Sequence, residues 1–159
     1  GLVEALSEGG RWRAVHLACH GVFEPENPVL SSVVLSPTET DDGLLTVLDV
    51  FRMDVPADLV VLSACQTALG KVYKREGVLG LPRAFLCAGA NQVLVSLWKV
   101  NDLATRALMT RFYELWNPKE GKGLPAAEAL RAAQEHVRSH EGWRHPYYWA
   151  AWVLWGLPD

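Results

Sequence analysis

A short apolar run that ends on polar residues constrains the fold more than any other feature of the sequence. Residues 59–62 are Leu, Val, Val and Leu, with no alternation of apolar and polar positions. Such a run is typical of a strand that is covered on both faces, as in a parallel sheet. It gives way to Ser, Ala, Cys, Gln and Thr at residues 63–67. Because chemistry collects beyond the carboxyl ends of parallel strands, Cys65 is a candidate nucleophile.

The three cysteines invite different interpretations. A free cysteine often acts as a small buried hydrophobe, and this interpretation is favoured for Cys87, which lies in an apolar helical stretch. It is weaker for Cys65, where apolar residues give way to polar ones. Three cysteines without a pairing pattern indicate reduced thiols and predict a cytoplasmic protein.

The other elements alternate between strands and helices. We expect strands at residues 13–19, 59–62, 92–98 and 149–155. We expect a helix at residues 47–52, capped by Thr46, and another at 82–87. Two longer helices are expected, one from a cap at Asn101 or Asp102 to Trp116 and one from Pro125 onward. Residues 32–35 and 44–46 are expected to pair as a hairpin outside the main sheet. This order predicts an α/β fold, a three-layer α-β-α sandwich with a mostly parallel sheet.

The composition limits the number of domains and the classes of molecule that the chain could bind directly. With 159 residues, half of them hydrophobic, the chain suits one domain or the greater part of one. The net charge of −3 provides no basic surface for nucleic acid and no polybasic membrane patch. No apolar run approaches the roughly 18 residues of a membrane span. Neither nucleic acid nor a membrane is therefore expected as a direct partner.

Two predicted strands end next to reactive side chains, His20 and Cys65, which are 65 − 20 = 45 positions apart. If these strands are neighbours in a parallel sheet, the two side chains emerge at one edge. An imidazole beside a thiol can take its proton and create the nucleophilic thiolate. The backbone N–H groups of Gly21 and Cys65 could then hold the oxyanion of a tetrahedral intermediate.

A metal site is the competing interpretation of the same region. His16, Cys19 and His20 are possible ligands, but no second pair of ligands follows at zinc spacing. His16 is expected to make a hydrogen bond in the core, and His136, His140 and His145 to lie on a solvated face and turn. We therefore expect neither a metal nor a cofactor.

Seven segments together resemble the caspase-like CHAT domain family, from about Arg13 to the end of the chain. They are HLACHG at 16–21, LSACQT at 62–67, GVLGLPRAF at 77–85, AGA at 88–90, SLWKVND at 96–102, FY at 112–113 and HPYYWAA at 145–151. The resemblance implies the caspase–haemoglobinase fold, shared with separase, gingipain and legumain type peptidases. It also implies a dyad in which Cys65 is the nucleophile and His20 the general acid and base, with Gly21 beside the oxyanion.

The same resemblance implies a cysteine endopeptidase that cuts protein or peptide substrates. Residues 96–98, including Ser96 and Trp98, are similar to the strand that lines the substrate cleft in this superfamily. Asp102 follows in a segment similar to the one with which separase contacts a basic side chain before the cut. Capping of a helix that begins at Leu103 is the alternative role of Asp102. The alternative functions are a catalytically silent interaction or scaffold domain and an unrelated thiol acyltransferase.

The chain departs from the family pattern in two respects. The strand–helix units that precede the histidine strand in the family are missing, so we interpret residues 1–159 as the C-terminal part of a CHAT domain with an incomplete sheet. In bacterial proteins such domains usually follow tetratricopeptide repeats, so an upstream repeat region or other regulator is an expected partner. Gln66 stands where many relatives carry Glu, which leaves its role open.

The charged loop 68–77 is expected to become ordered when the upstream repeat region is present.

Overall fold

The main sheet has four strands, three of them parallel. The computed structural model describes residues 5–6, 10–39, 41–63 and 80–157. The sheet contains β1 (Trp12–Leu17), β5 (Ala57–Leu62), β6 (Ala90–Ser96) and β7 (Trp152–Gly156), in the order β1-β5-β6-β7. The pairs β1–β5 and β5–β6 are parallel, and β7 runs antiparallel to β6. The predicted mostly parallel sheet is therefore confirmed.

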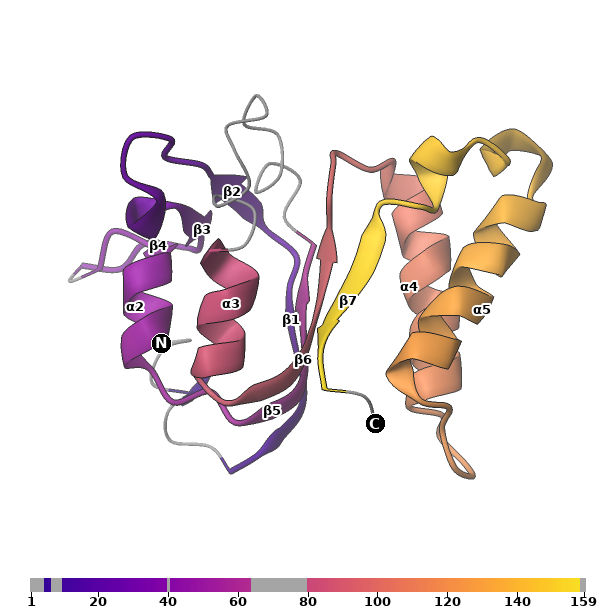
Figure 1. The fold of residues 1–159 in the computed structure, drawn as a ribbon, viewed down its shortest axis with the longest axis horizontal. Helices are drawn as coiled ribbons and strands as arrows, with labels where there is room; N and C mark the ends of the chain where they lie inside the picture. The colour runs from indigo at the N-terminus through magenta and orange to yellow at the C-terminus, as the bar shows by residue number, and fades with distance from the viewer. Residues whose placement is uncertain (1–4, 7–9, 40, 64–79, 158–159) are drawn as a thin grey trace.

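Helices cover both faces of this sheet (Figure 1). Helices α2 (Val47–Arg52) and α3 (Gly80–Cys87) lie on one face, and α4 (Asp102–Trp116) and α5 (Ala126–Ser139) lie on the other. Each face has its own apolar core. Val60 packs in the cluster that contains Phe85 of α3, and Val61 packs in the cluster that contains Phe112 of α4. The unbroken apolar run of β5 thus fills two cores, as expected for the central layer of a three-layer sandwich.

A small second sheet lies beside α2, next to the end of β1 (Figure 1). It consists of β2 (His20–Val22), β3 (Ser32–Val34) and β4 (Leu44–Thr46), paired antiparallel in that order. The short 3-10 helix η1 (Pro28–Leu30) connects β2 to β3. The predicted hairpin outside the main sheet is confirmed, and β2 is an additional strand that the sequence analysis did not predict.

The C-terminal strand is shorter than predicted. It begins at Trp152, because Pro146–Tyr148 form the 3-10 helix η3 and residues 149–151 form a turn. The ring of His145 accepts a hydrogen bond from the Tyr147 N–H, and that of His140 accepts one from Gly142 N–H at the start of η2 (Glu141–Trp143). These two histidines therefore cap short helices. None of the described helices is long and apolar enough to span a membrane.

Thr46 caps α2 as predicted, through a reciprocal capping box. Its hydroxyl accepts a hydrogen bond from the Asp49 N–H at 3.1 Å, and the Asp49 carboxylate accepts one from the Thr46 N–H at 3.0 Å. Two N–H groups that the first helical turn leaves without partners are satisfied in this way.

Replacing Thr46 by Ala should lower the free energy of unfolding by about 1 kcal/mol, because the Asp49 N–H loses its acceptor. Urea denaturation followed by circular dichroism measures this difference. Thr110→Ala, on the exposed side of α4, is the matched control and should change stability little. Equal effects of the two substitutions would show that the cap contributes nothing specific.

Candidate active site

Strands β1 and β5 bring the two predicted reactive segments to the same edge of the sheet. Leu17 pairs with Leu62 at the last position of both strands, and the Ser63 N–H donates to the Leu17 carbonyl at 3.0 Å. His20 lies three residues after Leu17 (20 − 17 = 3), and Cys65 lies three residues after Leu62 (65 − 62 = 3). Both chain segments therefore leave the sheet side by side, at equal distances along the chain.

His20 and Gly21 are held by the second sheet. His20 pairs with Val34 and Gly21 with Val33, whose side chain is fully buried. His20 is exposed, whereas Gly21 is buried beneath it. The backbone pairing fixes the position of the histidine, and its exposure leaves the ring accessible to a substrate. Cys65, Gln66 and the loop 68–77 lie outside the described residues.

The end of β6 is paired with β5 on one side and with β7 on the other. Ser96 pairs with Trp152, and the next residue, Leu97, donates its N–H to the Ala151 carbonyl at 2.8 Å. In this pattern Ser96 belongs to a non-hydrogen-bonded pair, so its own N–H and C=O point away from β7. The last pair between β5 and β6 is Leu62 with Val95, one position earlier. This parallel register directs the Ser96 N–H to the Leu62 carbonyl, so the backbone that follows the last β5–β6 pair is that of residues 97–98.

The side chains of this segment are anchored in the protein. The Ser96 side chain is buried, and its hydroxyl has no hydrogen-bond partner among the described residues. The Trp98 indole N–H donates to the Tyr147 carbonyl at 3.1 Å, which ties the segment after β6 to η3. A substrate contact made by this segment would therefore involve its backbone more readily than the Ser96 hydroxyl.

Asp102 does not cap α4, which corrects one of the two roles expected for it. Asn101 is the cap: its side-chain oxygen accepts a hydrogen bond from the Ala104 N–H at 3.0 Å. The helix begins at Asp102 itself, whose side chain is exposed. With the cap supplied by its neighbour, the Asp102 carboxylate is available for a contact outside the helix.

The two other cysteines differ in burial. Cys19 is half-buried against the core beside α2 and α3, and burial raises the pKa of its thiol, which keeps it protonated. Cys87 is exposed, so the interpretation of Cys87 as a buried hydrophobe is wrong. It lies at the end of α3, where the apolar side chains Leu81, Ala84 and Phe85 occupy the buried side of the helix.

His16 makes a hydrogen bond as predicted, but the bond lies at the surface and not in the core, because the His16 side chain is on the exposed side of β1. Its Nδ1 lies 3.1 Å from the Tyr113 hydroxyl, and the two rings are 5.8 Å apart. Burial lowers the pKa of His16 and raises the pKa of Tyr113 to about 12. Tyr113 directly follows Phe112, a buried residue of α4. This position beside the buried side of the helix is the sequence feature that could have identified Tyr113 as the partner of His16. This pair links β1 to α4 and leaves the imidazole neutral.

Within the described part of the chain, no three His, Cys, Asp or Glu side chains gather in a position to hold a metal ion. His16, Cys19 and His20 in particular form no such group there, and His16 bonds to Tyr113.

Comparison with known proteins identifies the family and the fold. The model of the CHAT domain family matches residues 2–157. Human tetratricopeptide repeat protein 28 is 43% identical over 114 residues, and the mouse protein of the same name is 40% identical over 114 residues. Each alignment covers 71% of this chain but 4% of the relative. The chain thus spans a small part of the curated relatives that it matches.

Two solved structures of the separase–securin complex from Saccharomyces cerevisiae share the fold. One has a TM-score of 0.53 and 23% identity over 72% of this chain, and the other has 0.51 and 21% over 78%. Each match covers 8% of the solved chain. The architecture is therefore that of the caspase-like domain of separase, as the sequence motifs predict.

Replacing His16 by Gln should reduce the loss of stability in mild acid. Because burial lowers the pKa of His16 in the folded protein, the unfolded chain binds the proton more readily. Neutral His16 therefore contributes to the free energy of unfolding above the ordinary histidine pKa of about 6.5. This contribution is lost as the pH falls below that value, because the unfolded chain then binds the proton. Urea denaturation at about pH 7 and about pH 5 should show a smaller difference for H16Q than for the natural chain. Parallel pH dependence in both proteins would contradict this account.

Proposed function

The chain belongs to the CHAT domain family, and we propose that the shared carboxyl edge of β1 and β5 is the active site of a cysteine endopeptidase. The observation that carries this proposal is the register of the two strands. Leu17 pairs with Leu62, so His20 and Cys65 follow at the same distance beyond neighbouring strand ends. A nucleophile and its base on adjacent strands can meet without any rearrangement of the sheet.

In the proposed reaction, His20 takes the proton of the Cys65 thiol and the resulting thiolate attacks the carbonyl carbon of the scissile peptide bond. The tetrahedral intermediate collapses when the C–N bond breaks and His20 gives its proton to the leaving amine. The acyl group then remains on Cys65 as a thioester. Water attacks this thioester with His20 as the base, which releases the acid product and restores the thiol.

The oxyanion of each tetrahedral intermediate needs N–H donors near His20. Gly21 is the neighbour of His20 in the same short strand, and its burial keeps this backbone away from bulk water. We assign the N–H groups of Gly21 and Cys65 to this role, since donors in a partly dry site stabilise developing charge more than water does.

Substrate binding is assigned to the segment after β6. The backbone of residues 97–98, which follows the last β5–β6 pair, could pair with an extended peptide, and Trp98 is held in place by Tyr147. The exposed Asp102 carboxylate, released from capping by Asn101, would pair with an Arg or Lys side chain before the scissile bond. The expected substrates are therefore proteins cut after a basic residue.

Regulation by a repeat region is part of the proposal. The relatives named above are tetratricopeptide repeat proteins, so a repeat region of a longer protein is a suitable regulator. We propose that such a region orders the loop 68–77, which directly follows Cys65 in the sequence.

An electrophilic peptide that ends in arginine tests the dyad. An acyloxymethyl ketone of this kind should form a covalent adduct on Cys65, detected by peptide mass spectrometry, because only a thiolate displaces the leaving group rapidly. Cys65→Ala should abolish the adduct, and His20→Ala should slow its formation at least about a hundredfold. Cys87→Ala, which removes an exposed thiol outside the site, is the control and should leave labelling unchanged. Equal labelling of Cys65 in the natural chain and H20A would favour a catalytically silent scaffold domain.

Asp102→Asn tests the preference for a basic residue. Loss of the carboxylate should lower kcat/KM for an arginine peptide about tenfold or more relative to a neutral norleucine peptide, since the cation loses its partner. Stability should change by less than about 1 kcal/mol, whereas Asn101→Ala should lower it by about that amount because it removes the cap. If D102N leaves the ratio of the two kcat/KM values unchanged, Asp102 has no role in specificity.

A further inference from the structure

Negative charge is concentrated in one part of the chain. Residues 20–54 contain seven carboxylates and a single basic side chain, Arg52, a net charge of −6 with His20 neutral. The whole chain carries −3, so the remaining residues carry a net charge of +3. The seven carboxylates are Glu24, Glu26, Glu39, Asp41, Asp42, Asp49 and Asp54. This acidic lobe comprises the second sheet, η1 and α2, and it repels nucleic acid and anionic lipid alike.

The same lobe exposes apolar side chains on α2 and η1. Leu48 and Phe51 of α2 are 36% and 44% exposed, and Val29 and Leu30 of η1 are 42% and 47% exposed. Helix η1 packs against α2, so the four residues belong to one region of the surface. We call these four residues the α2 surface. Apolar groups gathered on a charged lobe are typical of an interaction site.

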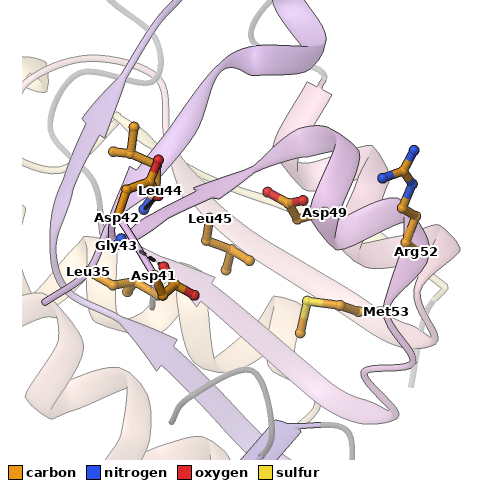
Figure 2. Close-up of a pocket in the computed structure, with 9 residues that line it drawn as sticks. All are labelled: Leu35, Asp41, Asp42, Gly43, Leu44, Leu45, Asp49, Arg52 and Met53. Atoms are coloured by element: carbon orange, nitrogen blue, oxygen red, sulfur yellow. Dashed lines mark hydrogen bonds between the residues drawn. The ribbon is translucent and has the colours of Figure 1, made fainter. Parts of the chain in front are cut away.

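A pocket of about 620 Å³ adjoins α2, between that helix and the turn that precedes β4 (Figure 2). Leu35, Leu45 and Met53 contribute its apolar lining. Asp41 and Asp42 come from the turn and Asp49 from the helix. The pocket therefore combines apolar walls with carboxylates at its margin, a combination that suits a long side chain with a cationic end.

Each of the three carboxylates has one oxygen in a local hydrogen bond. Asp41 accepts from the Gly43 N–H at 2.8 Å, Asp42 from the Leu44 N–H at 2.9 Å, and Asp49 from the Thr46 N–H. Their second oxygens accept no hydrogen bond from the described residues. Arg52, which also lines the pocket, forms no ion pair within 4.0 Å with any described carboxylate. The carboxylates are thus held in position and their charge is not neutralised.

We propose that the pocket and the α2 surface together bind a basic amphipathic segment of a partner protein. One Arg or Lys side chain of the partner enters the pocket, with its aliphatic part against Leu45 and Met53 and its cationic end at the carboxylates. The apolar side of the segment covers Leu48 and Phe51. The net charge of the lobe selects a cationic protein segment over nucleic acid or an anionic membrane. This inference goes beyond the proposed peptidase activity and does not require it.

The pocket lies close to the candidate active site. His20 pairs with Val34, and Val34 pairs in turn with Leu44, which lines the pocket. The three residues form one row across the second sheet, so the backbones of His20 and Leu44 are about two strand spacings, or about 10 Å, apart. A protein held in the pocket would therefore lie beside His20, which suits a surface that recruits a substrate or a regulator.

Binding of a fluorescent amphipathic peptide tests the proposal without any catalytic step. The probe is a synthetic helical peptide with leucine on one face and arginine on the other, measured by fluorescence anisotropy with C65A as the host protein. Asp41→Asn with Asp42→Asn should weaken binding about tenfold or more. Each asparagine keeps a side-chain oxygen that accepts the hydrogen bond within the turn, but the negative charge is lost. Glu120→Gln with Glu141→Gln is the control, because it also removes two negative charges, one from the turn after α4 and one from η2. It should change affinity less than about twofold. Leu48→Ser with Phe51→Ser should also weaken binding.

Several results would overturn the proposal. One is equal affinity for the two charge variants, and another is equal binding of a peptide with glutamate in place of arginine. Failure of the C65A protein to bind the arginine peptide at millimolar protein concentration is a third. Tighter binding of single-stranded DNA or of phosphatidylserine vesicles would reassign the surface to those ligands. A dimer that sedimentation detects in the natural chain and not in D41N/D42N would reassign it to a second copy of this chain.

Discussion

The parallel pairing of β1 with β5 is the interaction on which the rest of the molecule depends. Residues 59–62 of β5 are at most 1% exposed, and they divide their side chains between the two apolar cores. Such a strand cannot shift by one residue without exchanging the side chains of both cores. The register of Leu17 with Leu62 is therefore strongly determined, and with it the point at which the segments carrying His20 and Cys65 leave the sheet.

Each face of the sheet supports a different side of the candidate site. On the face of α4 and α5, the pairing of Ser96 with Trp152 and the bond from Trp98 to Tyr147 hold the segment assigned to substrate binding. On the opposite face, the second sheet holds His20 and, together with α2, forms the acidic lobe. The proposed catalytic edge thus lies between the segment assigned to substrate binding and the acidic lobe that we propose binds a basic segment.

The sequence predicted those parts of the structure that local chemistry determines. The apolar run of β5, the hairpin of β3 and β4 and the Thr46 cap each follow from a few neighbouring residues. Strand β2 was missed because His20–Val22 is short and pairs with residues ten or more positions away. The start of β7 was misplaced because Trp149 continues its apolar pattern, whereas His145 and Pro146 determine a 3-10 helix. Asn101 and Asp102 are both good caps, and sequence alone did not decide between them.

The central claim is that the neighbouring strand ends bring His20 to the thiol of Cys65. The most direct test is the alkylation rate of Cys65 by iodoacetamide as a function of pH, resolved from Cys19 and Cys87 by peptide mass spectrometry. A thiol paired with an imidazole should react as thiolate well below the ordinary cysteine pKa of about 8.5. In His20→Ala the midpoint of the profile should return to that value or above it. The same midpoint in the natural chain and in H20A would contradict the account, because the two side chains would then not interact.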